Sequence, residues 1–175
     1  MAKLTNELMN LCSVRYFKNF VQNSLKMNAA VAQRSSCIFC NIVNKIENTE
    51  LLYEDEDVCV FRDIKPATRF HVLTIPKRHI EDLSLYKNGC LVQQDAGLTK
   101  MLAVSKTVLL NNNLPVSDAR FGYHWPPFRS IKHLHLHTIA PESEMGIISK
   151  MIFMKDSYWF VSVIAIRILS TLHNV

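Results

Sequence analysis

The sequence predicts an α+β domain in which an antiparallel sheet packs against one main helix. Short segments rich in β-branched and aromatic residues are separated by turn residues, which predicts strands. One longer segment has apolar residues at helical spacing, which predicts the helix. The chain has 175 residues, of which 49% are hydrophobic and 20% charged, so it can bury a substantial core.

A short helix is expected first, over residues 37–45. Ser35 and Ser36 precede it and are candidate N-caps, since a serine hydroxyl can accept a hydrogen bond from a free backbone N–H. The acidic run 54–57 follows and predicts a turn.

Two strands are expected next, over residues 58–61 and 71–75, because both segments are rich in β-formers. Pro66 closes the first strand and Pro76 the second, since proline cannot donate to a strand ladder. Their short separation predicts that the two strands are antiparallel neighbours.

The main helix is expected over residues 94–111, where apolar side chains recur every three or four positions. A third strand is expected over 120–124 and a fourth over 131–139, with a loop forced between them by two consecutive prolines. Residues 146–172 contain a cluster of aromatic residues and are expected to form a packing element that ends in a helix.

The formal net charge of +5 is concentrated near the N-terminus. Residues 1–34 hold five basic side chains and one acidic side chain, a net of +4, and the remaining residues carry a net of +1. A body with so little net charge is not expected to bind nucleic acid. The basic tail has apolar residues at helical spacing, which is typical of a mitochondrial transit peptide; the alternative is a tail without a targeting role.

The five cysteines do not form a convincing disulfide framework, which indicates a reducing compartment, the cytoplasm or also the nucleus. The most apolar stretch near the C-terminus, residues 157–166, is only ten residues long. A membrane-spanning helix needs about twenty, so no membrane association is expected.

The strongest chemical signal is the alternation of His133, His135 and His137 with apolar residues. Side chains of a strand alternate between its faces, so the three imidazoles are expected on one face and Leu134 and Leu136 on the other. An imidazole can be a nucleophile, a general acid or a metal ligand. From the residues alone two interpretations stay open: a zinc site, and a phosphate site in which one imidazole attacks phosphorus.

With this motif the chain resembles the histidine triad (HIT) family of nucleotide hydrolases and transferases over about residues 35–165. Within the family it is most similar to a branch of adenosine 5′-monophosphoramidases, and its Gly-Tyr-His sequence is also similar to aprataxin. The resemblance implies a HIT-like fold, with a basic tail over 1–34, the domain over 35–143 and a C-terminal extension over 144–175 that packs on it. The motifs that carry the resemblance to the family are 37–40, 61–66, 71–79, 122–124 and 133–139, and the segments 125–131 and 157–160 carry the similarity to the branch.

The resemblance also implies an activity, the cleavage of the P–N bond of adenosine 5′-monophosphoramidates to AMP and an amine. His135 would be the nucleophile and form a nucleotidyl-histidine intermediate, assisted by His137, His71 and Ser130. The expected substrates are purine nucleotide phosphoramidates, including AMP joined to lysine, or aminoacyl-AMP. Two alternatives are an aprataxin-like removal of AMP from adenylated substrates and a non-catalytic nucleotide-binding scaffold. The implied nucleotide-binding residues are Phe61, Asp63, Ile64, His124, Ser130, His135 and His137.

Finally, the resemblance implies a candidate structural zinc site formed by Cys37, Cys40, His79 and His133. The alternative for the two cysteines is that they are packed free thiols. No cofactor is expected to be required for catalysis. A homodimer built through the main helix and a sheet edge is expected from the family.

Overall fold

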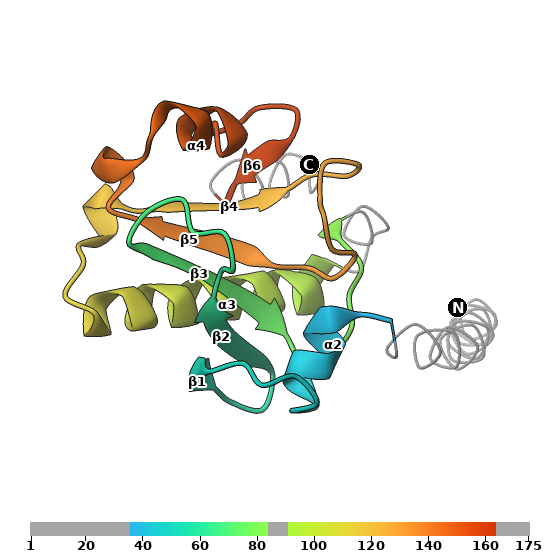
Figure 1. The fold of residues 1–175 in the computed structure, drawn as a ribbon. Coiled ribbons are helices and arrows are strands. Elements are labelled where there is room, and N and C mark those ends of the chain that lie inside the picture. The colour runs from blue at the N-terminus through green and yellow to red at the C-terminus, as the bar shows by residue number, and fades with distance from the viewer. Residues whose placement is uncertain (1–35, 84–90, 164–175) are drawn as a thin grey trace, which may run out of the picture. The chain divides into compact units, whose positions relative to one another are not determined.

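Six strands form one antiparallel sheet, in the order β1-β2-β3-β5-β4-β6 (Figure 1). The computed structural model describes residues 36–83 and 91–163. The predicted tail over 1–34 lies outside the described residues. The expected α+β architecture, with an antiparallel sheet and one main helix, is confirmed. The strands are β1 (Leu51–Glu54), β2 (Val58–Arg62), β3 (Phe70–Pro76), β4 (Arg120–His124), β5 (Leu136–Ala140) and β6 (Phe160–Ser162).

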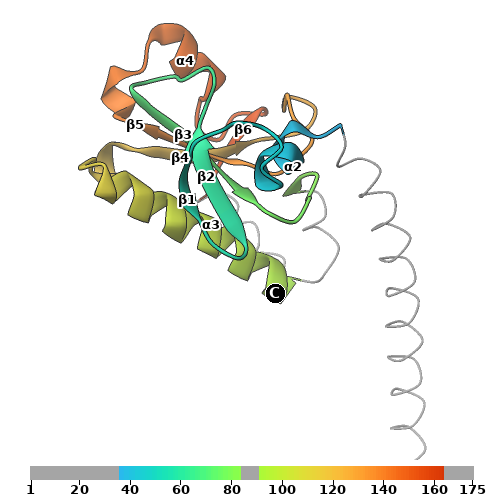
Figure 2. The same ribbon diagram turned by 60° about the horizontal axis from the view of Figure 1, so that its bottom comes forward.

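The main helix, α3 (Leu91–Asn111), lies against one face of the sheet, and the short helix α2 (Ile38–Val43) lies on the other side (Figures 1 and 2). A third helix, α4 (Ile147–Ile152), precedes β6. Two 3₁₀ turns, Val116–Asp118 and Glu142–Glu144, are also present among the described residues. No helix in the described part of the chain is long and apolar enough to cross a membrane.

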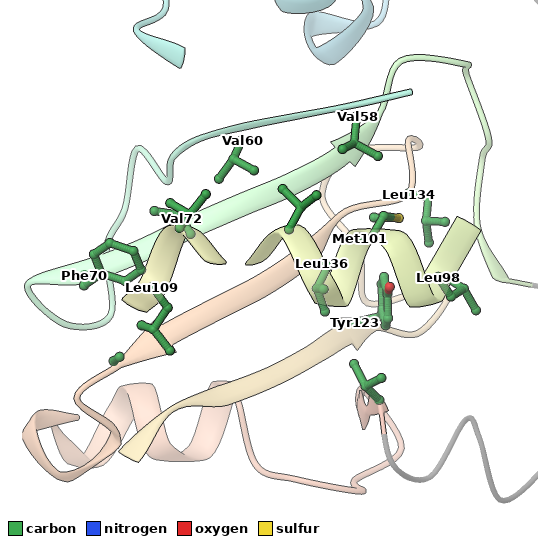
Figure 3. Packing of buried hydrophobic residues seen from close by; sticks show 14 of the residues in the cluster. Val58, Val60, Phe70, Val72, Leu98, Met101, Leu109, Tyr123, Leu134 and Leu136 are labelled. Carbon is green, nitrogen blue, oxygen red and sulfur yellow. The ribbon is translucent and has the colours of Figure 1, made fainter. Parts of the chain in front are cut away.

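Alternation along the strands divides the buried residues between two faces. Val58, Val60 and Val72 pack in the same cluster as the apolar side chains of α3, among them Met101 and Leu109 (Figure 3). The intervening residues of the same strands belong to a second cluster with α2: Cys59, Phe61, Leu73 and Ile75. The face of the sheet toward α3 therefore packs into a hydrophobic core, and the opposite face is the one on which His71 and His137 lie.

One polar contact crosses the core between β3 and α3. The side-chain oxygens of Thr74 and Ser105 lie 2.6 Å apart, and both residues are fully buried. The Ser105 hydroxyl donates to the carbonyl oxygen of Met101, so the Thr74 hydroxyl is the donor to Ser105. Both hydroxyls are thereby satisfied within the core.

The register of the sheet places His71 and His137 near each other. In the antiparallel pair of β3 and β5, His71 lies opposite Ile139 and Leu73 lies opposite His137. His71 and His137 are therefore diagonal neighbours, with Cβ atoms on the same face. The predicted pairing of the strands at 58–61 and 71–75 is also confirmed.

The fourth strand begins later than predicted, at Leu136 rather than at residue 131. The backbone before it bonds elsewhere: the Leu134 N–H donates to the carbonyl oxygen of Ile80, at 2.6 Å, instead of entering a ladder. Of the three histidines, only His137 therefore lies within a strand. Alternation still holds, since Leu134 and Leu136 belong to the α3 cluster.

Other boundaries also differ from the predictions. The N-cap of α2 is Cys37, without a side-chain cap, so the prediction of a cap at Ser36 is wrong; Ser35 lies outside the described residues. Strand β1 was not predicted. In the aromatic segment after residue 146, a helix comes at the start and a strand follows, and the predicted terminal helix lies beyond the described residues.

Gly122 occupies the crowded centre of β4, where the strand pairs with both β5 and β6. A Cβ at this position would lie 2.5 Å from a ring carbon of Phe160 and 2.8 Å from the carbonyl oxygen of Val161. Because both the ring and the backbone would have to move, Gly122→Ala is expected to lower the free energy of unfolding by about 1–3 kcal/mol. Urea unfolding followed by circular dichroism measures this change.

The matched control is Gly97→Ala on α3, where an added Cβ meets nothing within 4 Å. This change is expected to raise stability by about 0.5–1 kcal/mol, since alanine restricts the unfolded chain and favours a helix. If Gly122→Ala unfolded at the same urea concentration as the unmodified chain, the packing of Phe160 against β4 would be wrong.

Candidate active site

The imidazole of His135 is held in the tautomer that a nucleophile needs. Its Nδ1 lies 2.6 Å from the backbone carbonyl oxygen of His133. A carbonyl oxygen can only accept, so Nδ1 carries the proton and donates it to this bond. Nε2 is then left with a free lone pair. The side chain is buried but not sealed, with 7% of the residue exposed.

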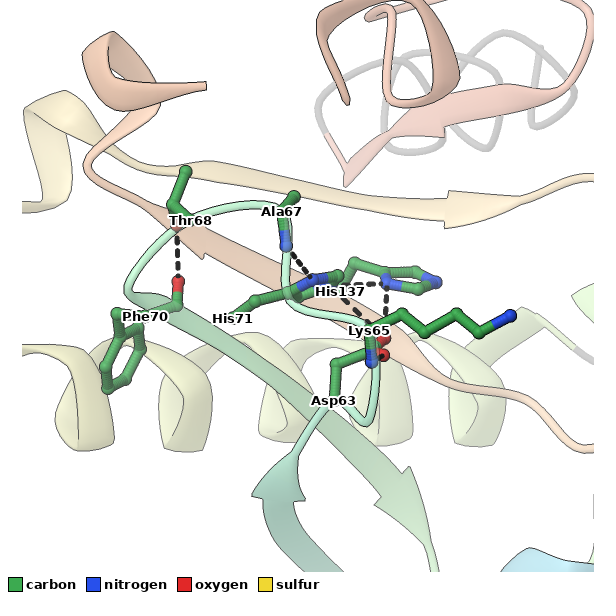
Figure 4. Close-up of polar contacts among 7 residues, drawn as sticks. All are labelled: Asp63, Lys65, Ala67, Thr68, Phe70, His71 and His137. Carbon is green, nitrogen blue, oxygen red and sulfur yellow. Dashed lines mark hydrogen bonds and ion pairs between the residues drawn. The ribbon is translucent and has the colours of Figure 1, made fainter. Parts of the chain in front are cut away.

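His71 and His137 form a hydrogen-bonded relay whose direction can be deduced (Figure 4). The backbone N–H of Ala67 donates to His71 Nδ1 at 3.1 Å. The proton of a neutral His71 is therefore on Nε2, which donates to His137 Nδ1 at 2.9 Å. His137 must then carry its own proton on Nε2. That atom is buried and has no hydrogen-bond partner among residues 36–83 and 91–163, so its N–H is left unsatisfied by the fold.

The two catalytic candidates stand side by side, since the ring centroids of His135 and His137 are 4.9 Å apart. One ring presents a lone pair and the other presents an N–H group. A nucleophile beside a hydrogen-bond donor is the arrangement required for attack on a phosphate, because the donor can stabilise the charge that develops on oxygen.

Asp63 lies at the edge of this relay. Its Oδ2 is 3.5 Å from His71 Nε2 and 3.9 Å from His137 Nδ1. Its Oδ1 accepts the backbone N–H of Lys65 at 2.8 Å, which fixes the turn after β2. The neighbouring Ile64 is 94% exposed. The structure therefore brings Asp63 to the histidines and leaves an apolar side chain open to solvent beside it.

The other predicted nucleotide-binding residues differ in their contacts and in their exposure to solvent. His124 donates its Nδ1–H to the carbonyl oxygen of Trp159 at 3.1 Å, and its ring centroid is 5.0 Å from that of His137. Ser130 is exposed in the loop before the triad. Phe61 is only 3% exposed and its ring contacts that of Phe39, so it lies beneath the surface.

Phe153 belongs to the site but was not identified from the sequence. Its ring centroid lies 5.3 Å from those of His71, His124 and His137. Arg120 of β4 donates to its carbonyl oxygen and thereby holds the segment after α4 over the histidines. The aromatic content of residues 146–172 was a signal for packing, but it did not indicate which aromatic residue covers the site.

Arg129 anchors the loop that leads to the triad, and sequence reasoning gave it no role in the fold. Its guanidinium contacts Glu81 at 2.7 Å and Asp82 at 2.9 Å. The Arg129 and Asp82 side chains are 10% and 11% exposed, so this ion pair is largely shielded from solvent. It ties the loop to the segment after β3, which also contains His79.

Burial keeps the site imidazoles neutral. Desolvation lowers the pKa of His71 to about 4, and it also lowers the pKa values of His124 and His135. The pKa of His137 lies well below its usual value, for the same reason and because of the neighbouring histidines. Neutral rings are consistent with the tautomers deduced from the hydrogen bonds.

This burial predicts that the chain loses stability in mild acid. Below pH 6.5 the histidines of the unfolded chain take up protons, whereas His71 in the folded chain remains neutral until about pH 4. The unfolded state then binds more protons, so the free energy of unfolding falls as the pH falls through this window. The slope is up to about 1.4 kcal/mol per pH unit for each such histidine.

Urea midpoints at pH 7.5, 6 and 5 measure this dependence. A midpoint that stays constant over this range would mean that the histidines are not kept neutral by the fold.

A second cluster lies where α2 meets the segment after β3. The Nδ1 atom of His133 is 3.5 Å from Cys37 Sγ and 3.6 Å from Cys40 Sγ, and His79 Nδ1 is 3.2 Å from Cys40 Sγ. All four ligand atoms lie within 4.8 Å of one another. Zinc–sulfur and zinc–nitrogen bonds of 2.0–2.3 Å place tetrahedral ligands about 3.3–3.8 Å apart, so these residues fit a zinc ion.

The tautomer of His133 supports this fit. Its Nε2 lies 2.9 Å from the carbonyl oxygen of Pro76, so Nε2 carries the proton and the Nδ1 lone pair faces the thiols. A second-sphere carbonyl partner of this kind is typical of metal-binding histidines. The triad is thus divided: His133 belongs to the cysteine cluster, whereas the rings of His135 and His137 lie side by side in the candidate active site.

Asp63, His71 and His137 also lie within 4.8 Å of one another. Here the tautomer opposes a metal, because the Ala67 N–H occupies His71 Nδ1 and leaves the proton on the inward-facing Nε2. This second group is therefore a hydrogen-bond relay, whereas the cysteine cluster is a candidate metal site.

Comparisons with known proteins agree with this geometry. The protein-family model described as "Scavenger mRNA decapping enzyme C-term binding" matches residues 36–152. The chain is 45% identical over 130 residues to adenosine 5′-monophosphoramidase HINT3 of Xenopus tropicalis, covering 73% of this chain and 82% of the relative. It is 44% identical over 132 residues to the protein of the same name from Mus musculus, covering 74% and 78%.

A further relative is the bifunctional adenosine 5′-phosphosulfate phosphorylase/adenylylsulfatase HINT4 of Arabidopsis thaliana, 45% identical over 106 residues, or 60% of this chain and 70% of that one. Among solved structures, a HIT family hydrolase from Legionella pneumophila has a TM-score of 0.53 at 26% identity, covering 59% of this chain and 91% of its own. A zinc-bound histidine triad family protein from Mycobacterium smegmatis has a TM-score of 0.52 at 26% identity, covering 65% and 82%.

Proposed function

This chain belongs to the histidine triad family, and on that basis we propose that it hydrolyses adenosine 5′-monophosphoramidates to AMP and an amine. The relatives from Xenopus tropicalis and Mus musculus carry the name of this activity and match most of the chain. One observation carries the proposal: the His135 ring, with a lone pair on Nε2, lies beside the His137 ring, whose Nε2–H has no partner among the described residues.

In the first step, His135 Nε2 attacks the α-phosphorus while the P–N bond breaks, and the leaving amine takes up a proton from solvent. The His137 Nε2–H donates to a phosphate oxygen and stabilises the charge that gathers there. The Nδ1–H of His135 stays bonded to the His133 carbonyl oxygen, at 2.6 Å in the free chain. This bond stabilises the positive imidazole that forms when Nε2 is joined to phosphorus.

In the second step, water attacks the phosphorus of the nucleotidyl-histidine and loses a proton to solvent. The phosphorus–Nε2 bond breaks, AMP leaves, and His135 recovers its lone pair. Imidazole and water supply the bonds that form and break in both steps. Zinc, held by Cys37, Cys40, His79 and His133, would have a structural place outside the phosphate site.

The nucleotide would bind through residues near the relay. The Asp63 carboxylate can accept hydrogen bonds from the two ribose hydroxyls. The exposed Ile64 offers an apolar contact to the base. Ser130 and His124 are proposed to contact the phosphate or the leaving group. The expected homodimer and the cytoplasmic, nuclear or mitochondrial location stay predictions.

The direct test incubates the purified full-length chain with adenosine 5′-phosphoramidate and follows AMP by chromatography. AMP and ammonia are expected in equal amounts. Adenosine 5′-phosphosulfate is tested alongside, because the Arabidopsis thaliana relative is named for that substrate. Release of AMP only from the phosphosulfate would replace the proposed P–N hydrolysis with a different substrate class. Release from neither substrate would contradict the proposal.

A further inference from the structure

The peptide group between His133 and Leu134 joins the cysteine cluster to the nucleophile. Its carbonyl oxygen accepts the Nδ1–H of His135 at 2.6 Å. Its N–H donates to the carbonyl oxygen of Ile80, also at 2.6 Å. His133 is fully buried and Leu134 is 4% exposed, so water does not compete for these bonds. The orientation of this one peptide group therefore determines where the His135 imidazole points.

The peptide group is linked to the cysteine cluster in two ways, through its own residue His133 and through its hydrogen-bond partner Ile80. His133 presents Nδ1 to the thiols of Cys37 and Cys40, at 3.5 and 3.6 Å. Ile80 follows His79 in the chain, and His79 Nδ1 lies 3.2 Å from Cys40 Sγ. A group that binds the four side chains of the cysteine cluster therefore also restrains this peptide group, through His133 and through Ile80.

We propose that zinc bound by Cys37, Cys40, His79 and His133 orients the imidazole of His135 and thereby sets the rate of P–N cleavage. The inference rests on the proposed function and adds a means of regulating it, since catalysis would follow the metal occupancy of a site that does not touch the substrate. His133 is a positioning residue in this scheme, because it acts through its carbonyl oxygen on His135.

The expected effect follows from the difference between metal-free and metal-bound clusters. Without zinc, the cluster is held by contacts between imidazoles and thiols, which are weak hydrogen-bonding groups. With zinc, four coordinate bonds fix the same side chains. Loss of groups that orient a site from outside typically costs 10–100-fold in activity, and a shift of about 1 Å in a reacting group costs about 100-fold.

Nucleotide binding should respond much less than catalysis. Asp63 and Ile64 lie in the turn after β2, and the contacts of Asp63 are to Lys65, His71 and His137 rather than to the cysteine cluster. Removal of zinc is therefore expected to lower kcat by about 10–100-fold and to leave the affinity for AMP nearly unchanged.

The experiment uses the full-length chain, stripped of metal with a chelator and then reloaded with zinc chloride. Zinc per chain is measured by atomic emission, folding by circular dichroism, AMP affinity by calorimetry and kcat by AMP release. One zinc per chain is expected, and reloading should restore kcat. Cys40→Ser removes a ligand and should mimic stripping. Cys59→Ser is the matched control, because Cys59 is a buried free thiol of the same hydrophobic cluster that lies outside the metal cluster.

A second readout does not depend on activity. In ¹⁵N-labelled protein, the Nδ1 proton of His135 should exchange slowly with solvent when zinc is bound and faster when it is removed; His135→Ala identifies its signal. If stripping unfolds the chain, His79→Asn, which retains three ligands, is titrated with zinc instead. In that variant kcat should rise with the zinc bound.

Three results would overturn the inference: no bound zinc, full kcat in the stripped and folded chain, or an exchange rate that zinc does not change. A different result would separate it from the proposed function. If neither form released AMP but zinc still protected the His135 proton, the proposed function would be wrong and the positioning by zinc would stand.

Discussion

Replacing His135 with alanine is expected to lower the rate of AMP release by about four orders of magnitude or more. The substitution removes the Nε2 lone pair that attacks phosphorus, and with it the covalent intermediate. His137 cannot take over, because the direction of the relay places its proton on Nε2 and its lone pair on Nδ1, which faces His71. The decrease in the rate of AMP release from adenosine 5′-phosphoramidate is measured in assays stopped at fixed times.

Two controls make this prediction specific. Thr138→Val changes a residue of β5 whose side chain faces α3, on the side of the sheet opposite to His137. The Thr138 hydroxyl has no hydrogen-bond partner among the described residues, so activity should be retained. His135→Gly leaves room for free imidazole, which should restore part of the rate. Activity of His135→Ala close to that of the unmodified chain would exclude a nucleotidyl-histidine at this position.

Replacing His137 with phenylalanine is expected to lower kcat by about 10²–10³-fold, which is typical of losing one donor to a transition-state oxyanion. Phenylalanine keeps a ring among Phe153 and Phe160, so the packing of the site should survive. It removes the Nε2–H that is proposed to donate to a phosphate oxygen. Because that donor matters most in the transition state, KM should change much less than kcat.

The relay can be tested by combining this change with His71→Phe. His71 acts on the substrate only through the tautomer of His137, so its loss should cost little more once His137 has been replaced. The two single changes should therefore be strongly non-additive in the logarithm of kcat. Additive losses would mean that His71 contributes to catalysis independently of His137.

The central elements could be predicted from the sequence because their signals are local. The apolar spacing over 94–111 is long enough to identify α3, and the β-rich segments around Val60 and Leu73 are bounded by turns and prolines. The edge strands β1 and β6 have four and three residues, which is too short for a reliable pattern.

The division of the histidine triad could not be deduced from alternation alone. Alternation holds, since Leu134 and Leu136 both pack in the α3 cluster, but it does not indicate which side chains of other elements each imidazole contacts. The resemblance to the family, rather than spacing, indicated that His133 joins Cys37 and Cys40. The contacts of Arg129 with Asp82, and of Phe153 with the imidazoles, link residues distant in the chain, so no local pattern could show them.

The bond between Thr74 and Ser105 bears on the uniqueness of the native arrangement more than on its energy. An apolar helix on an apolar sheet can roll or slide by small amounts at little cost, whereas two buried hydroxyls are satisfied in only one alignment. Replacing both with apolar residues of similar shape could leave the free energy of unfolding nearly unchanged. It would remove the contact that fixes the position of α3 on β3. The same strand, β3, carries His71 on its opposite face.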